Sequence, residues 1–100
     1  MRLIDIARVI RSKNAGPTTL TLDLLFNDAA GYERASAAPA LSAEAIAARY
    51  GVPRERVQVM PYPAALAMKI SLDRVVVAGD PGDRDVYGAQ QHAPLLEIEL

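Results

Sequence analysis

The chain of 100 residues contains no cysteine and no tryptophan, and it has a single histidine and few aromatic side chains. The lack of cysteine excludes disulfide bonds, thiolate catalysis and zinc sites built on sulfur, and it fits a reducing cytoplasm. Because only 5% of the residues are Phe, Trp or Tyr, the core must consist mainly of Leu, Ile, Val and Ala. The apolar fraction of 51% is enough for one modest core.

The chain also lacks a strong charge of either sign, with a formal net charge of −1. No basic excess favours nucleic acid or an anionic membrane as a partner. No apolar run reaches membrane-spanning length, and the first residues lack the charged-then-apolar pattern of a secretion signal. We therefore expect a cytoplasmic protein. So many apolar residues in so short a chain also suggest a partner subunit, in a homo- or hetero-oligomer.

Strand and helix patterns follow one another along the chain. Residues 18–26 (TTLTLDLLF) form the clearest strand, because leucines alternate with threonines and an aspartate. Helices are expected over 27–38 and 42–50, with Asn27 or Asp28 and then Ser42 as N-caps, and Gly51 ending the second. The remaining strands are expected over 7–11, 57–60, 68–72, 75–77 and 95–100, the last with Leu96, Ile98 and Leu100 facing inward.

This order of elements predicts one domain, residues 1–100, with an α+β fold. Two strands, two helices and further strands imply a mainly antiparallel sheet with two helices on one face. The ferredoxin-like arrangement is the nearest common relative. Residues 1–12 fit both a helical stripe and a strand face, and their later β-branched residues favour the strand. Pro61 and Pro63 are expected to stop the strand that precedes them.

The loop 79–94 (GDPGDRDVYGAQQHAP) is the main candidate site. A loop this long in a compact domain is usually functional or disordered, and its specific polar groups favour order and function. His92 suits general acid/base work, although an equally good interpretation is a loop histidine bonded to backbone. Asp80 and Asp83 are better explained as turn-capping residues, whereas Asp85 could be an acid/base group or an ion-pair partner of Arg84. The predicted catalytic residues are His92, Tyr87 and Asp85, and the predicted substrate-binding residues of this loop are Gln90 and Gln91.

The second candidate is the stretch 11–17 (RSKNAGP), expected to be a turn. Arg11 and Lys13, with Ser12 and Asn14, could hold a carboxylate or phosphate, because arginine binds such groups in bidentate fashion and turn N–H groups can form an anion nest. The alternative is two solvated cations at a hairpin tip. The glycine spacings of phosphate-binding and dinucleotide-binding loops are absent, as is a serine-hydrolase elbow. One histidine without an EF-hand spacing gives no metal prediction, and no cofactor is predicted.

Together, RSKNAGP before an alternating strand and GDPGDRDVYGAQQHAPLL near the end resemble one family. This family is a small bacterial domain of unknown function associated with acyclic-terpene-utilisation (AtuA-like) proteins. The resemblance covers essentially the whole chain and implies a ferredoxin-like domain that occurs beside, or fused to, a larger AtuA-like protein. Arg11, Ser12 and Gly16 match an RSGDKG-like turn of related fused domains, whereas Asn14 and Ala15 depart from it. The family supplies no established catalytic residues.

Our first expectation is an accessory subunit that pairs with a larger AtuA-like protein and helps to form a site for a small carboxylate or acyl substrate. Hydration, dehydration or a related lyase step is the expected class, because it needs only acid/base groups and anion binding. One alternative is a non-catalytic structural or regulatory module. A further alternative is a standalone homo-oligomer that binds a small molecule or builds active sites between chains.

Overall fold

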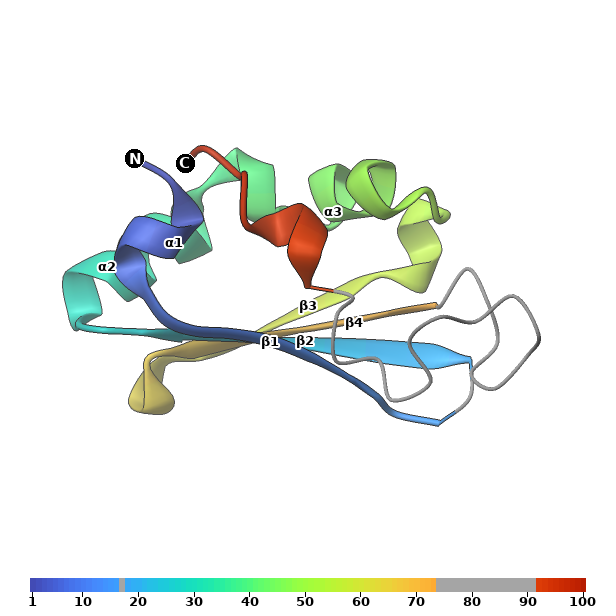
Figure 1. Ribbon diagram of the computed structural model, residues 1–100, viewed down its shortest axis with the longest axis horizontal. Helices are drawn as coiled ribbons and strands as arrows, with labels where there is room; N and C mark the ends of the chain where they lie inside the picture. Colours follow the sequence, from blue (N-terminus) through green and yellow to red (C-terminus); the bar gives the residue numbers. More distant parts are fainter. Residues whose placement is uncertain (17, 74–91) are drawn as a thin grey trace.

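A computed structural model describes residues 1–16, 18–73 and 92–100 of the chain, apart from the side chain of Ala93. The protein has an α+β fold with two layers (Figure 1). One layer is a four-stranded antiparallel sheet in the order β1-β2-β4-β3. The three described α-helices and the C-terminal segment lie together on one face of this sheet (Figure 1). This is the α+β layering that the sequence predicts.

The sheet consists of two antiparallel strand pairs, β1–β2 and β3–β4, which are joined by the pairing of β2 with β4 at the centre. The strands are β1 (Ala7–Asn14), β2 (Thr19–Phe26), β3 (Gln58–Tyr62) and β4 (Ala67–Asp73). The helices are α1 (Leu3–Ile6), α2 (Ala29–Ala37) and α3 (Ala43–Tyr50), with short 3₁₀ turns η1 (Pro39–Leu41), η2 (Arg54–Arg56), η3 (Pro63–Ala65) and η4 (Ala93–Leu95). The layering is consistent with a ferredoxin-like α+β fold, although α2 and α3 both lie between the second and third described strands.

The core lies between the sheet and the helices, and β2 supplies its centre. Leu20, Leu22, Leu24 and Phe26 alternate along β2 and are each at most 2% exposed. Successive side chains of a strand point to opposite faces, so the residues between them face away from the helices. The expected alternation over residues 18–26 is therefore confirmed.

The helix ends follow from local capping chemistry. The Gly31 N–H donates to Oδ1 of Asp28 at 2.8 Å, and the Ala45 N–H donates to Oγ of Ser42 at 3.2 Å. Gly51 ends α3 with φ of 69°, the left-handed region that glycine adopts without strain. Asp28, Ser42 and Gly51 thus have the roles predicted from the sequence.

The C-terminal segment corrects one expectation, since residues 95–100 do not form a strand. Leu95 and Ile98 are fully buried, whereas Leu96 is 37% exposed. A turn follows η4, closed by the Ile98 N–H donating to the Leu95 carbonyl at 3.2 Å, and both Leu95 and Ile98 belong to the core. The Leu3 N–H donates to the Ile98 carbonyl at 2.9 Å, which ties residues 95–100 to α1.

Three boundaries also differ from the sequence-based expectation. The first residues contain both predicted elements, because α1 leads directly into β1. The β1 strand continues to Asn14, so most of the expected turn 11–17 is strand. Pro61 does not stop β3, because β3 is at the edge of the sheet, where a missing N–H costs no ladder bond. The predicted strand 75–77 lies outside the described residues.

No helix in the described ranges is long and apolar enough to cross a membrane.

Candidate functional site

The predicted basic stretch is divided between the two faces of the sheet. Arg11 pairs across the hairpin with Asp23, and Lys13 pairs with Thr21. Ser12, between them, points toward the helix side and is only 6% exposed. The alternation of a strand therefore separates Arg11 and Lys13 from Ser12.

His92 lies with Ser12 on the helix side of β1. The His92 backbone N–H donates to the Ser12 Oγ at 3.1 Å, and Nδ1 of His92 lies 3.4 Å from the same oxygen. The two predicted segments therefore meet in space at Ser12 and His92. The structure does not bring His92 together with Arg11, because these side chains occupy opposite faces of β1. Asn14, the last residue of β1, is partly buried.

The other loop residues proposed for the site lie outside the described residues; these are Asp85, Tyr87, Gln90 and Gln91. Within the described part of the chain, no group of three or more His, Cys, Asp or Glu side chains could hold a metal ion.

A cluster of charges occupies the sheet face opposite the described helices. Strand register aligns Arg11, Asp23 and Lys69 across β1, β2 and β4, and we refer to these three residues as the charged row. Nε of Arg11 donates to Oδ2 of Asp23 at 3.1 Å. Lys13 lies two residues beyond Arg11 on β1 and therefore on the same face of the sheet. Three cations thus surround one carboxylate in a protein whose net charge is −1.

A second row, parallel to the first, is apolar. Register aligns Val9, Leu25, Ala67 and Tyr62 across all four strands, and we refer to these residues as the apolar row. Tyr62 is 46% exposed, which is high for a large apolar side chain. The two rows are two residues apart along each strand, a separation of about 7 Å.

The two rows line one shallow hollow of about 340 Å³. Arg11, Lys13, Asp23 and Lys69 form its charged end. Leu25, Tyr62, Ala65 and Ala67 form its apolar end. A volume of this size lies at the small end of the range for ligand pockets.

Sequence analysis did not select Asp23, Lys69 or Tyr62 as site residues. Asp23 and Lys69 gave one local signal, their position on the polar face of alternating strands, whereas Tyr62, between two prolines, gave none. Their assembly with Arg11 depends on which strands pair and in what register, and one sequence does not supply that information.

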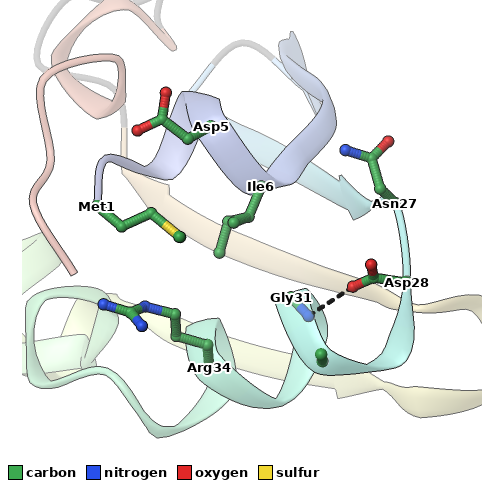
Figure 2. A pocket seen from close by; sticks show the side chains of 8 residues that line it. Met1, Asp5, Ile6, Asn27, Asp28, Gly31 and Arg34 are labelled. Atoms are coloured by element: carbon green, nitrogen blue, oxygen red, sulfur yellow. Dashed lines mark hydrogen bonds between the residues drawn. The ribbon is translucent and has the colours of Figure 1, made fainter.

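A second hollow, of about 390 Å³, lies between α1 and α2 (Figure 2). Its carboxylates have structural partners, because Asp28 caps α2 and Asp5 accepts the Arg2 backbone N–H at 2.9 Å. Arg34 reaches from α2 toward Met1 at the other end of this hollow (Figure 2). Two carboxylates against one arginine make this rim a poorer match for an anionic ligand than the charged row.

Gly31 of the second hollow leaves room for the Asp28 carboxylate that caps α2. A Cβ atom there would lie 3.3 Å from Oδ1 of Asp28 and 3.5 Å from Cβ of Ile6.

Comparison with known proteins places the chain in one family. The family model described as "Domain of unknown function (DUF4387)" matches residues 3–99, and the chain belongs to this family. No curated protein and no solved structure matches the chain significantly.

Proposed function

We propose that this DUF4387 domain binds a small carboxylate or acyl compound on the open face of its sheet, as a cytoplasmic accessory subunit of a larger AtuA-like protein. The observation that carries the proposal is the hollow with one charged and one apolar end. A carboxylate with a short hydrocarbon body matches both ends at once. The association with an AtuA-like protein comes from the resemblance of the two sequence motifs.

Arg11 is suited to bind the anionic group. Its Nε is bound to Asp23, while the terminal Nη1 and Nη2 groups make no hydrogen bond within the described residues. Arginine forms its strongest contacts with carboxylates through such paired N–H groups. Lys13 and Lys69 would add positive charge beside the bound head group.

The shallowness of the hollow supports an accessory role. Ligand pockets normally enclose most of the ligand surface, whereas a site on the face of a sheet covers one side only. A larger subunit placed over the charged and apolar rows would close the site and exclude water. The exposed ring of Tyr62 would then be covered by the partner.

The proposed reaction is a hydration, dehydration or related lyase step, with acid/base groups from His92, Tyr87 and Asp85. Gln90 and Gln91 would orient the substrate. Because His92 contacts Ser12 on the helix side, its role requires the reacting group to approach around the edge formed by β1. The single substitutions His92→Ala and Arg11→Ala should each reduce turnover of the assembled complex. Unchanged turnover in both variants would contradict the shared-site proposal.

Ligand binding is tested by titrating ¹⁵N-labelled protein with hexanoate while amide and arginine side-chain signals are followed by NMR. We expect shifts at Leu25, Ala67 and the Arg11 Nε–H, and none with pentylammonium, a cation of similar size. Arg11→Gln and Lys69→Gln should weaken hexanoate binding by about tenfold each, since each removes one charged contact. The matched control is Arg54→Gln, because Arg54 pairs with Glu44 away from the hollow. Chemical-shift changes scattered over the surface, or an equal loss of hexanoate affinity in all three variants, would refute binding at this site.

Partner binding is tested separately by co-purifying the chain with the larger AtuA-like protein encoded beside it, followed by sizing. A stoichiometric complex supports the accessory role, and Tyr62→Glu should weaken it. A chain that forms only a homo-oligomer would favour the standalone alternative.

A second candidate, a non-catalytic structural or regulatory module, is favoured by one observation. Both Arg11 and His92 already have intramolecular partners, Asp23 and Ser12. In that case the complex would form, hexanoate would not bind, and substitutions in the charged row would change assembly without changing turnover.

A further inference from the structure

Asp23 is an unusual residue for the open face of a sheet. Its side chain is only 11% exposed, although the described helices lie on the opposite face. In the charged row it lies between Arg11 on β1 and Lys69 on β4. Asp23 therefore forms the floor of the charged end of the hollow.

The Asp23 carboxylate also fixes the guanidinium of Arg11. It accepts the Nε–H at 3.1 Å, while the Arg11 side chain as a whole is 62% exposed. Holding Nε restricts the flexible side chain, and the terminal N–H groups, which bond to none of the described residues, would bind the ligand. A pre-positioned arginine loses less conformational freedom when it binds a carboxylate.

From this geometry we infer that Asp23 determines the specificity of the hollow, by positioning Arg11 and by limiting the negative charge that the ligand head group carries. This inference rests on the proposed carboxylate-binding function. The preferred ligand is a monocarboxylate with a short apolar body, and a second carboxylate on the same head group is penalised by the buried negative charge.

The physical basis is that Coulomb energy scales with ligand charge. A carboxylate bound to the Nη groups of Arg11 shares one guanidinium with Asp23, and a doubly charged head group experiences twice the repulsion from Asp23. Removing the charge of Asp23 should therefore help a dianion more than a monoanion. An Asp23 carboxylate far from the bound head group would not change this ratio.

The test compares hexanoate with butylmalonate, which has the same six-carbon acid chain and one more carboxylate on its second carbon. Both are titrated at mildly alkaline pH, where they carry one and two charges. Asp23→Asn should tighten the binding of hexanoate by about threefold and that of butylmalonate by about ninefold, so that the affinity ratio moves toward the dianion. Lys69→Gln should move the ratio the other way, which keeps the test independent of any one variant's stability.

Asp73 provides the matched control. It also accepts an arginine Nε, from Arg56 at 2.8 Å, and it lies on β4 beyond the hollow. Asp73→Asn should leave the affinity ratio unchanged.

The positioning role has its own measurement, the NMR signal of the Arg11 Nε–H. The signal should stay sharp and protected in Asp23→Asn, whose amide oxygen can still accept the bond, and should broaden in Asp23→Ala. If the unaltered protein binds hexanoate but Asp23→Asn leaves the ratio of the hexanoate and butylmalonate affinities unchanged, the specificity inference alone would be overturned. Failure of the unaltered protein to bind either acid would overturn the proposed function itself.

Discussion

The backbone N–H of His92 donates a hydrogen bond to the Ser12 hydroxyl oxygen at 3.1 Å, joining residues 80 positions apart. Ser12 is nearly buried, and Nδ1 of the His92 ring lies 3.4 Å from the same oxygen. One hydroxyl therefore attaches the C-terminal segment to the edge strand β1.

Replacing Ser12 by alanine should lower the free energy of unfolding by about 1–3 kcal/mol, because a part-buried backbone N–H loses its acceptor. Urea unfolding measures this change. Hydrogen exchange at the His92 and Leu95 amides should accelerate more than exchange in β2. The control is Ser36→Ala on α2, where an exposed hydroxyl contacts the Glu33 carbonyl and a change within about 0.5 kcal/mol is expected. Equal effects of the two substitutions would contradict the anchoring role of Ser12.

A neighbouring pair of leucines tests the conformation of the C-terminal segment. Leu95→Ala should destabilise the protein by about 2–5 kcal/mol, because it removes a fully buried side chain from the core. Leu96→Ala should change stability by less than about 0.5 kcal/mol, since Leu96 is 37% exposed. Thermal or urea unfolding distinguishes the two. A larger loss of stability in Leu96→Ala than in Leu95→Ala would instead indicate that Leu96 faces inward, as an extended strand over 95–100 requires.

Gly51 tests the end of α3. Its φ of 69° is strained for residues with a side chain, so Gly51→Ala should cost about 1 kcal/mol. No atom lies within 4 Å of a Cβ placed there, so the cost would come from backbone strain rather than from a clash. Gly51→Asn should be milder, because asparagine tolerates this conformation better. A neutral Gly51→Ala substitution, measured by urea unfolding, would mean that α3 ends in another conformation.

The pair formed by Glu44 and Arg54 predicts a pH dependence. The hydrogen bond from Arg54 Nε, at 3.0 Å, lowers the pKa of Glu44 from its ordinary value of 4.5. A carboxyl with a lowered folded-state pKa stabilises the fold above its unfolded pKa, and this contribution is lost as the pH falls through the folded value.

Arg54→Ala should therefore raise the Glu44 pKa toward 4.5, as measured by NMR titration of its carboxyl carbon. The stability difference between the variant and the unaltered protein should be small at neutral pH, because both groups are exposed, and should disappear in acid. Arg49→Ala serves as the control, because Arg49 donates to the Pro94 carbonyl, which does not titrate, and its stability effect should be independent of pH over the same range. A Glu44 pKa that does not respond to loss of Arg54 would contradict the pairing.

Local patterns predicted the elements whose signals are contained within a few residues. Asp28 and Ser42 were identifiable as caps because a short side-chain oxygen reaches an N–H three residues later. Residues 18–26 were identifiable as a strand because burial on one face requires a period of two. The segment 95–100 misled the same reasoning, because LLEIEL fits both a strand and a turn that places Leu95 and Ile98 together.

The sequence by itself determined the α+β class, the helix caps and the leucine face of β2, because each of these depends on neighbours in the chain. Tertiary structure alone decided that Arg11 and Ser12 serve opposite faces, that His92 reaches Ser12, and that Asp23 and Lys69 join Arg11. The physical reason is that strand pairing and register bring together residues far apart in sequence, and a shift of one residue would exchange the two faces.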